Sequence, residues 1–145
     1  MRKRDSSEVR GAADQLIRAV QSVLDAWEQD EDGFDPELGE GGACQEVASA
    51  MAGALSEIGV DEVVEVYTEF DGGHVFLVAN LADGVFRVDV PPGAYETGAG
   101  YVWRKRDGVR LGPEDLILDR VEGPISDHEF RHRYAEEGEG HPEPF

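Results

Sequence analysis

The stretch Gly41-Gly42-Ala43-Cys44-Gln45-Glu46-Val47-Ala48 decides the fold, because it joins the only cysteine to the start of an apolar-periodic segment. Apolar residues recur after it at helical spacing, which predicts a helix from about Ala43 to Ile58 that ends at Gly59. A thiol in the first turn of a helix lies near unpaired backbone N–H groups and the positive end of the helix dipole. Both stabilise a thiolate. The sequence therefore makes Cys44 a candidate nucleophile.

Three predicted strands follow this helix. The first runs from Val63 to Phe70 and precedes a turn at Asp71-Gly72-Gly73. The second, His74 to Ala79, is nearly all apolar, which indicates a central strand covered on both faces. The third runs from Val85 to Val90 and is halted by two prolines. We therefore expect a small antiparallel sheet beside the helix.

The hairpin between the second and third strands brings His74 and Asp89 together. With a two-residue loop His74 lies directly opposite Asp89, and with a four-residue loop Asp89 faces Phe76, one diagonal step from His74. In both registers the side chains share one sheet face near the helix, roughly 5 to 8 Å apart. An odd-numbered loop or a bulge would separate them.

These three residues can be assigned the roles of a nucleophilic site. Cys44 would attack as a thiolate, His74 would act as base and then acid, and Asp89 would orient the imidazole. The backbone N–H of Cys44 is the natural first oxyanion donor, and a second donor should come from upstream, where Gln29 is one option.

The residues around these positions resemble the transglutaminase-like branch of the papain-like cysteine enzymes. The matching stretches are Gly41 to Ala48, Gly73-His74-Val75-Phe76-Leu77-Val78 and Phe86-Arg87-Val88-Asp89-Val90-Pro91. The likeness covers about residues 41 to 92, and Val75 departs from it because the family more often has an aromatic residue after its histidine. The resemblance implies acyl transfer through a thioester on a peptide, protein or amide substrate, with no cofactor. It leaves hydrolysis, deamidation and transamidation open.

Two other interpretations remain open. Singly, a cysteine at a helix start is often a small buried residue, a histidine at a strand start a boundary residue, and an aspartate before prolines a turn residue. A non-catalytic member of the same fold would bind a protein partner. Tyr95, Tyr101 and Trp103 would then either line a cleft or belong to the core.

The segment His128-Glu129-Phe130-Arg131-His132 matches the H-E-x-x-H pattern of zinc peptidases and supplies the second alternative. Arg131 places a charge inside a motif whose helix is normally buried. Glu129 also completes a capping box with Ser126, and only a short acidic tail follows to supply a third ligand. A solvated terminal helix explains these residues better than a metal site, so no metal ligand is assigned.

Composition excludes several classes of function. The formal net charge is −19, with 13 basic and 32 acidic residues, so nucleic acid is not an expected partner. Lys3 and Lys105 are the only lysines, which fits either a halophilic source or a GC-rich genome. Ser6 to Gln15 holds no apolar signal region, and no run approaches a membrane span. We expect a cytoplasmic protein.

The remaining segments complete an α+β domain over residues 1–135, with a disordered acidic tail over 136–145. A long amphipathic helix from Val9 to Trp27, capped by Ser6 or Ser7, should pack on the core, and residues 29–42 should form a loop. We further expect a loop over 95–101, a hairpin around Asp107-Gly108 and an edge strand over 116–121. The family resemblance implies a papain-like core in which N-terminal helices pack on the antiparallel sheet.

Overall fold

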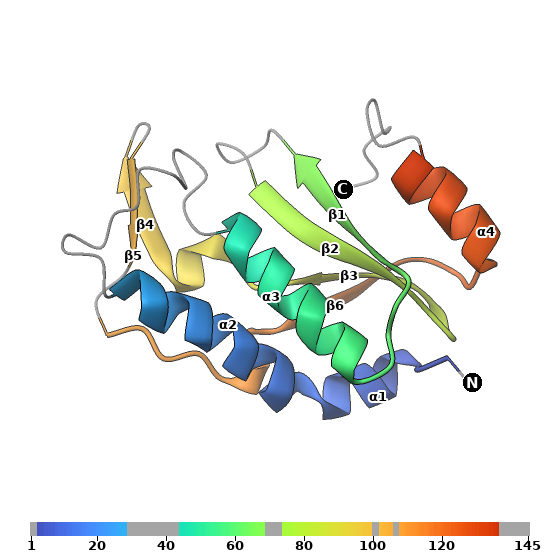
Figure 1. The fold of residues 1–145 in the computed structure, drawn as a ribbon, viewed down its shortest axis with the longest axis horizontal. Helices are drawn as coiled ribbons and strands as arrows, with labels where there is room; N and C mark the ends of the chain where they lie inside the picture. Colours follow the sequence, from blue (N-terminus) through green and yellow to red (C-terminus); the bar gives the residue numbers. More distant parts are fainter. Residues whose placement is uncertain (1–2, 29–43, 69–73, 100–101, 106–107, 137–145) are drawn as a thin grey trace.

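The structure is a computed structural model that describes residues 3–28, 44–68, 74–99, 102–105 and 108–136. It is an α+β fold in which helices pack on a four-stranded antiparallel sheet (Figure 1). The helices are α1 (Ser6–Gly11), α2 (Ala13–Glu28), α3 (Cys44–Glu57) and α4 (Asp127–Phe130). The strands are β1 (Val63–Thr68), β2 (His74–Leu81), β3 (Gly84–Asp89), β4 (Glu96–Ala99), β5 (Val102–Lys105) and β6 (Ile117–Glu122). Short helical turns η3 (Pro92–Ala94), η4 (Pro113–Asp115) and η5 (Arg131–Glu136) complete the order.

The N-terminal helix differs from its prediction in two ways. It is broken at Ala12, so that α1 and α2 are separate helices. The N-cap is Asp5, not Ser6 or Ser7, because Asp5 and Glu8 form a reciprocal capping box. The hydroxyl of Ser6 instead donates to Asp83 in the β2–β3 turn. The predicted core face is confirmed, with these residues buried: Val9, Ala13, Leu16, Ile17, Val20 and Leu24.

The main sheet has the order β1-β2-β3-β6, and every neighbouring pair is antiparallel. Strand β2 is therefore interior, as its apolar sequence predicts, and β6 is the expected edge strand. The turn between β2 and β3 is tight, because Leu81 already pairs with Gly84. Gly84 has φ +151°, and a Cβ there would lie 2.7 Å from the Glu122 carbonyl oxygen. Glycine is thus required at this corner.

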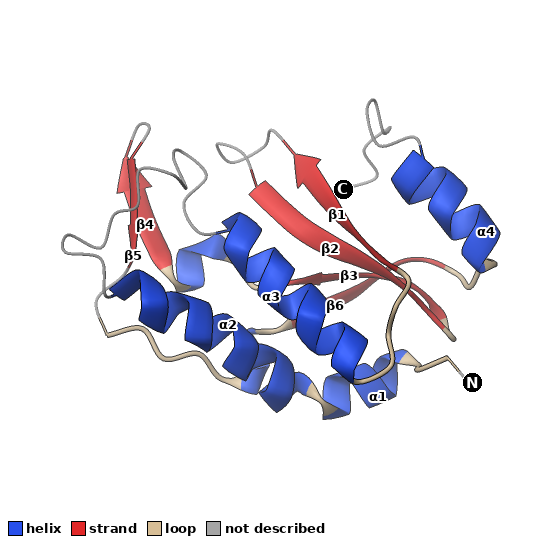
Figure 2. Ribbon diagram, viewed as in Figure 1, coloured by secondary structure: helices blue, strands red, loops and turns tan. Residues whose placement is uncertain are grey.

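Two apolar layers cover the two faces of this sheet. On the first face, α1, α2 and α3 pack over the odd-numbered residues of β2, including Leu77 and Ala79. On the second face, Phe130 and Tyr134 of α4 and η5 pack over Phe76 and other residues that point the opposite way. We call these the α3 face and the α4 face. Figure 2 shows α4 apart from the other three helices.

Helix α3 follows its predicted course. Val47, Ala48, Met51 and Leu55 are buried against the sheet and α2. The helix stops at Gly59, whose φ of +94° lets the Val60 N–H return to the Leu55 carbonyl. The Ile58 carbonyl accepts a hydrogen bond from Arg4, and the Arg4 carbonyl accepts one from Ala82. The end of α3 therefore lies at the β2–β3 turn.

The segment after β3 is not organised as predicted. Residues expected to form a loop make β4, and β4 pairs with β5 in a separate two-stranded hairpin. The hairpin expected around Asp107-Gly108 is wrong, because the partner of β5 comes before it in sequence and not after it. Tyr95 is fully buried in the α3-face core, which resolves its role in favour of packing. Tyr101 and the Trp103 side chain lie outside the described residues.

Three further predictions concern parts of the chain that the structure does not describe. They are the loop over 29–42, the Asp71-Gly72-Gly73 turn and most of the acidic tail. Within the described ranges, none of the helices has both the length and the apolar character needed to cross a bilayer.

Candidate active site

His74 and Asp89 meet at one end of the sheet, as the hairpin geometry predicts. Leu77 pairs with Val88, and continuing this register places Asp89 opposite Phe76, one diagonal step from His74. Imidazole Nε2 lies 2.8 Å from carboxylate Oδ2. Both side chains are buried, with 7% and 2% of their surfaces exposed. The diagonal register, which was one of the two predicted, is the one observed.

The contact with Asp89 determines which ring nitrogen of His74 carries a proton. A carboxylate oxygen only accepts hydrogen bonds, so Nε2 must be the donor. In the neutral ring Nδ1 is then the nitrogen that can accept a proton. The pair is thus arranged as a base whose tautomer is held by a carboxylate, which is the arrangement general base catalysis uses.

Asp89 has two further hydrogen-bond donors. Its Oδ1 accepts the backbone N–H of Val90 at 2.8 Å. Its Oδ2, the oxygen that contacts His74, also accepts from the Arg87 guanidinium at 2.8 Å. Three donors from β2, β3 and the residue after β3 therefore hold the carboxylate in one orientation.

Phe76 packs against both His74 and Arg87. Its ring centroid is 5.8 Å from that of His74, and the Arg87 guanidinium carbon lies 4.3 Å from it. Phe76 is itself buried in the α4-face core. The cluster is therefore anchored to packed apolar side chains and not to a loop.

Helix α3 begins at the same end of the sheet. Ser49 donates to Glu65 at 3.1 Å, and Glu65 pairs with Leu77. From Ser49 the helix start is five residues away, about 7.5 Å. From Leu77 the start of β2 is three residues away, about 10 Å in the same direction. Figure 1 shows the first turn of α3 and the start of β2 together.

The face on which the pair lies differs from the expectation. Val75 and Val88 pack with α3, so the alternation of each strand turns His74 and Asp89 to the α4 face. The two residues share a face, as predicted, but it is the one directed away from α3. A thiol at the start of α3 would have to meet the imidazole beyond the strand ends, not within the layer between helix and sheet. The Cys44 side chain and Gln29 lie outside the described residues.

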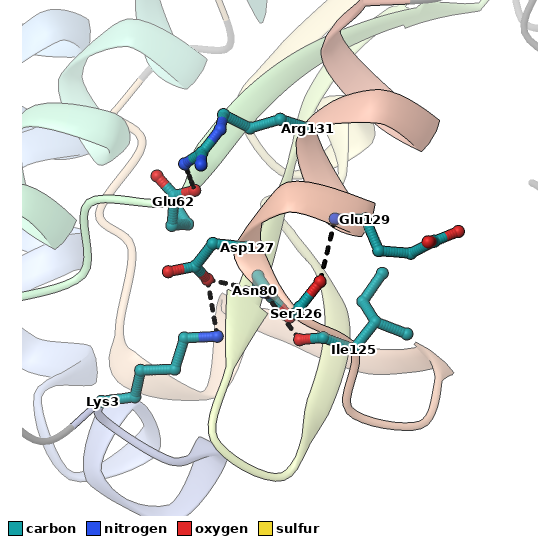
Figure 3. A network of polar contacts seen from close by, with 8 residues as sticks. All are labelled: Lys3, Glu62, Asn80, Ile125, Ser126, Asp127, Glu129 and Arg131. Atoms are coloured by element: carbon teal, nitrogen blue, oxygen red, sulfur yellow. Dashed lines mark hydrogen bonds and ion pairs between the residues drawn. The ribbon is translucent and has the colours of Figure 1, made fainter.

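The competing H-E-x-x-H segment lies on the surface of the C-terminal helix. Ser126 caps α4 by accepting the N–H of Glu129, as predicted (Figure 3). The Glu129 carboxylate, which was expected to complete a capping box, pairs with Arg133 instead. Both His128 and His132 are exposed. Among the residues the structure describes, no three histidine, cysteine or acidic side chains are grouped as a metal site would require.

The same helix start is tied to the rest of the molecule by a polar network. Asp127 accepts hydrogen bonds from the buried Asn80 at 2.9 Å and from Lys3 at 2.7 Å, while Arg131 pairs with Glu62 (Figure 3). The hydrogen bond from Lys3 lowers the pKa of Asp127. The network thus joins the N-terminus, β2 and α4.

A cavity of about 220 Å³ adjoins this network and is lined in part by Arg4, Asp61 and Leu81. Leu81 ends β2 whereas His74 begins it, so they lie about 20 Å apart along the strand. The cavity is therefore not a pocket of the His74–Asp89 pair.

No family model matches this chain, and searches of curated proteins and of solved structures found no match either.

Proposed function

We propose that this protein is a cysteine-dependent acyl-transfer enzyme with a transglutaminase-like, papain-like core, acting on a peptide, protein or amide. Cys44 is the nucleophile, His74 the base and acid, and Asp89 the residue that orients the imidazole. The observation that carries the proposal is the buried 2.8 Å contact between His74 and Asp89 at the end of the sheet where α3 begins with Cys44.

In the proposed reaction His74 Nδ1 takes the thiol proton of Cys44, and the sulfur attacks the substrate carbonyl carbon. The tetrahedral intermediate collapses as the imidazolium gives this proton to the leaving amine, which leaves a thioester on the cysteine. Water or an amine then attacks the thioester carbonyl, passes its proton to the imidazole and releases the acyl product. The thiolate leaves and takes the proton back. Asp89 stabilises the positive imidazole in each half-reaction.

The position of Cys44 supports its part in this scheme. As the first residue of α3 it is followed by backbone N–H groups that have no partner within the helix. These groups and the helix dipole favour a thiolate, and the Cys44 N–H is the proposed first oxyanion donor.

The test is the rate of alkylation of Cys44 by iodoacetamide as a function of pH. Cys44 is the only thiol, so the rate reports on it alone. We expect the native rate to titrate well below the ordinary thiol value of about 8.5. In His74→Gln the rate should fall at neutral pH by about tenfold or more, because the ion-pair partner is lost.

The matched control is His128→Gln, which removes an exposed histidine and should leave the profile unchanged. A thiol that titrates normally in both the native chain and His74→Gln would overturn the proposal. An unreactive thiol in the folded protein would do the same, and the His74–Asp89 pair would then be a structural element of the core under α4.

A further inference from the structure

We infer that Arg87 is a positioning residue for the His74–Asp89 pair. It holds the Asp89 carboxylate in place and partly neutralises the negative charge with which that carboxylate stabilises the His74 imidazolium. Its catalytic meaning rests on the proposed function above. The effect of Arg87 on the protonation of His74 does not depend on that function.

The inference starts from the oxygen that the two residues share. Asp89 Oδ2 lies 2.8 Å from His74 Nε2 and 2.8 Å from an Arg87 terminal nitrogen. A guanidinium is always charged and donates in a rigid planar geometry, so it restrains the carboxylate more strongly than a neutral donor would.

The position of Arg87 follows from strand periodicity and packing. It is two residues before Asp89 on β3, so both side chains point to the α4 face. Its guanidinium lies over the buried Phe76 ring, which directs the side chain toward Asp89 at the end of β3. Arg87 remains 31% exposed, whereas Asp89 is buried. The guanidinium therefore closes the solvent side of the pair.

The charged groups around His74 determine the sign of the effect. From β3 these are Asp89 in contact and Arg87 beyond it, and Asp119 of β6 lies opposite Arg87 in register. From η5, Tyr134 packs with Phe76 in the α4-face core, and its hydroxyl donates to Glu122. Glu65 of β1 bonds to α3. Arg87 is thus the nearby cation in the described contacts, and a cation disfavours the protonated imidazole.

The experiment is an NMR titration of the histidine rings, with His74 assigned from the signal lost in His74→Gln. It is done in a Cys44→Ala background so that no thiol titrates with the ring. In Arg87→Gln we expect the pKa of His74 to rise by about 0.5 unit, because one positive charge is removed at a distance of several ångströms. Arg87→Lys, which keeps the charge but loses the planar fork, should fall between this variant and the parent.

The control is Arg110→Gln, which removes an exposed arginine that pairs with Asp25 and should leave the pKa of His74 unchanged. A purely structural Arg87 would lower stability in both Arg87 variants without moving that pKa, and this result would overturn the inference. Should Arg87→Gln fail to fold, Arg87→Met removes the same charge while keeping an unbranched side chain to pack on Phe76, and a pKa of His74 in Arg87→Met equal to that of the parent overturns the inference as well. The alkylation profile of Cys44 is a separate readout: a shifted His74 pKa beside a normally titrating thiol upholds Arg87 and refutes the proposed enzyme.

Discussion

His74 and Asp89 lie on neighbouring strands, one diagonal step apart, on the face turned away from α3. His74 Nε2 is 2.8 Å from Asp89 Oδ2. A pair placed within the helix–sheet layer would be sealed from substrate by α3. On the opposite face the pair is also buried, and the proposed reaction requires the thiol to reach it past the strand ends. Whether Cys44 reaches His74 thus depends on how far the first turn of α3 extends past the strand ends.

Asp89→Asn tests the role of the carboxylate. The amide is uncharged, so it stabilises an imidazolium less and can present a donor to His74 in place of an acceptor. We expect the alkylation rate of Cys44 at pH 7 to fall by about tenfold or more. Stability should fall by about 1–3 kcal/mol because hydrogen bonds from Arg87 and Val90 are weakened.

The control for this change is Asp14→Asn, which alters an exposed aspartate on α2, remote from the pair. It should alter neither the alkylation rate nor the urea midpoint. An Asp89→Asn protein with native alkylation kinetics would show that the carboxylate plays no part in the reactivity of the thiol.

Phe130→Ala tests whether α4 is an integral part of the fold. Phe130 is fully buried on the α4 face, and its ring lies 5.2 Å from that of Tyr134. Removing a buried phenylalanine costs about 3–5 kcal/mol, so urea denaturation should show a loss in that range. His128→Ala on the exposed side of the same helix should change stability by less than about 0.5 kcal/mol. A loss below about 1 kcal/mol for Phe130→Ala would mean that α4 packs only loosely.

The Lys3–Asp127 contact predicts a small pH dependence of stability. The hydrogen bond from Lys3 lowers the pKa of Asp127 below 3.8, so this carboxyl stabilises the fold above about pH 4. The contribution is lost as pH falls through the folded-state pKa. Because Asp127 is 43% exposed, solvent screening limits it to about 0.5 kcal/mol.

Lys3→Ala should therefore be less stable than the parent at pH 7 by no more than this amount, with the gap closing by pH 2. Paired urea titrations at the two pH values measure it. A gap that stays constant between them would assign the effect of Lys3 to packing and not to charge.

Two glycines should respond to alanine in opposite directions. Gly84→Ala places a Cβ 2.7 Å from a backbone oxygen at a φ of +151°, so we expect a loss of about 1–3 kcal/mol. Gly53 lies exposed in α3 with open space around its Cβ position, and Gly53→Ala should stabilise by roughly 0.5–1 kcal/mol. Thermal unfolding of both variants checks the pair. Equal shifts of the two midpoints would contradict the geometry of the β2–β3 turn.

Periodicity and turn chemistry were enough to predict the elements whose order is local. The stripe along α3, its stop at Gly59 and the three strands from Val63 to Val90 agree with the structure to within two residues. The Ser126 cap of the last helix was also predicted from the sequence. The break at Ala12 and the β4–β5 hairpin were not, because both depend on competition between neighbouring segments and not on one segment's pattern.

The sequence by itself determined that His74 and Asp89 share a face in any hairpin of even register, because side chains alternate with a period of two. The even register itself comes from the structure. Only the tertiary structure decided which face the two residues share, since both faces of β2 are apolar and either could have received α3. It also decided the role inferred for Arg87, which lies two residues before Asp89. The guanidinium packs over Phe76 and donates to Asp89 Oδ2, the oxygen that also contacts His74. Alternation specifies which side chains lie together, but only packing specifies what covers them.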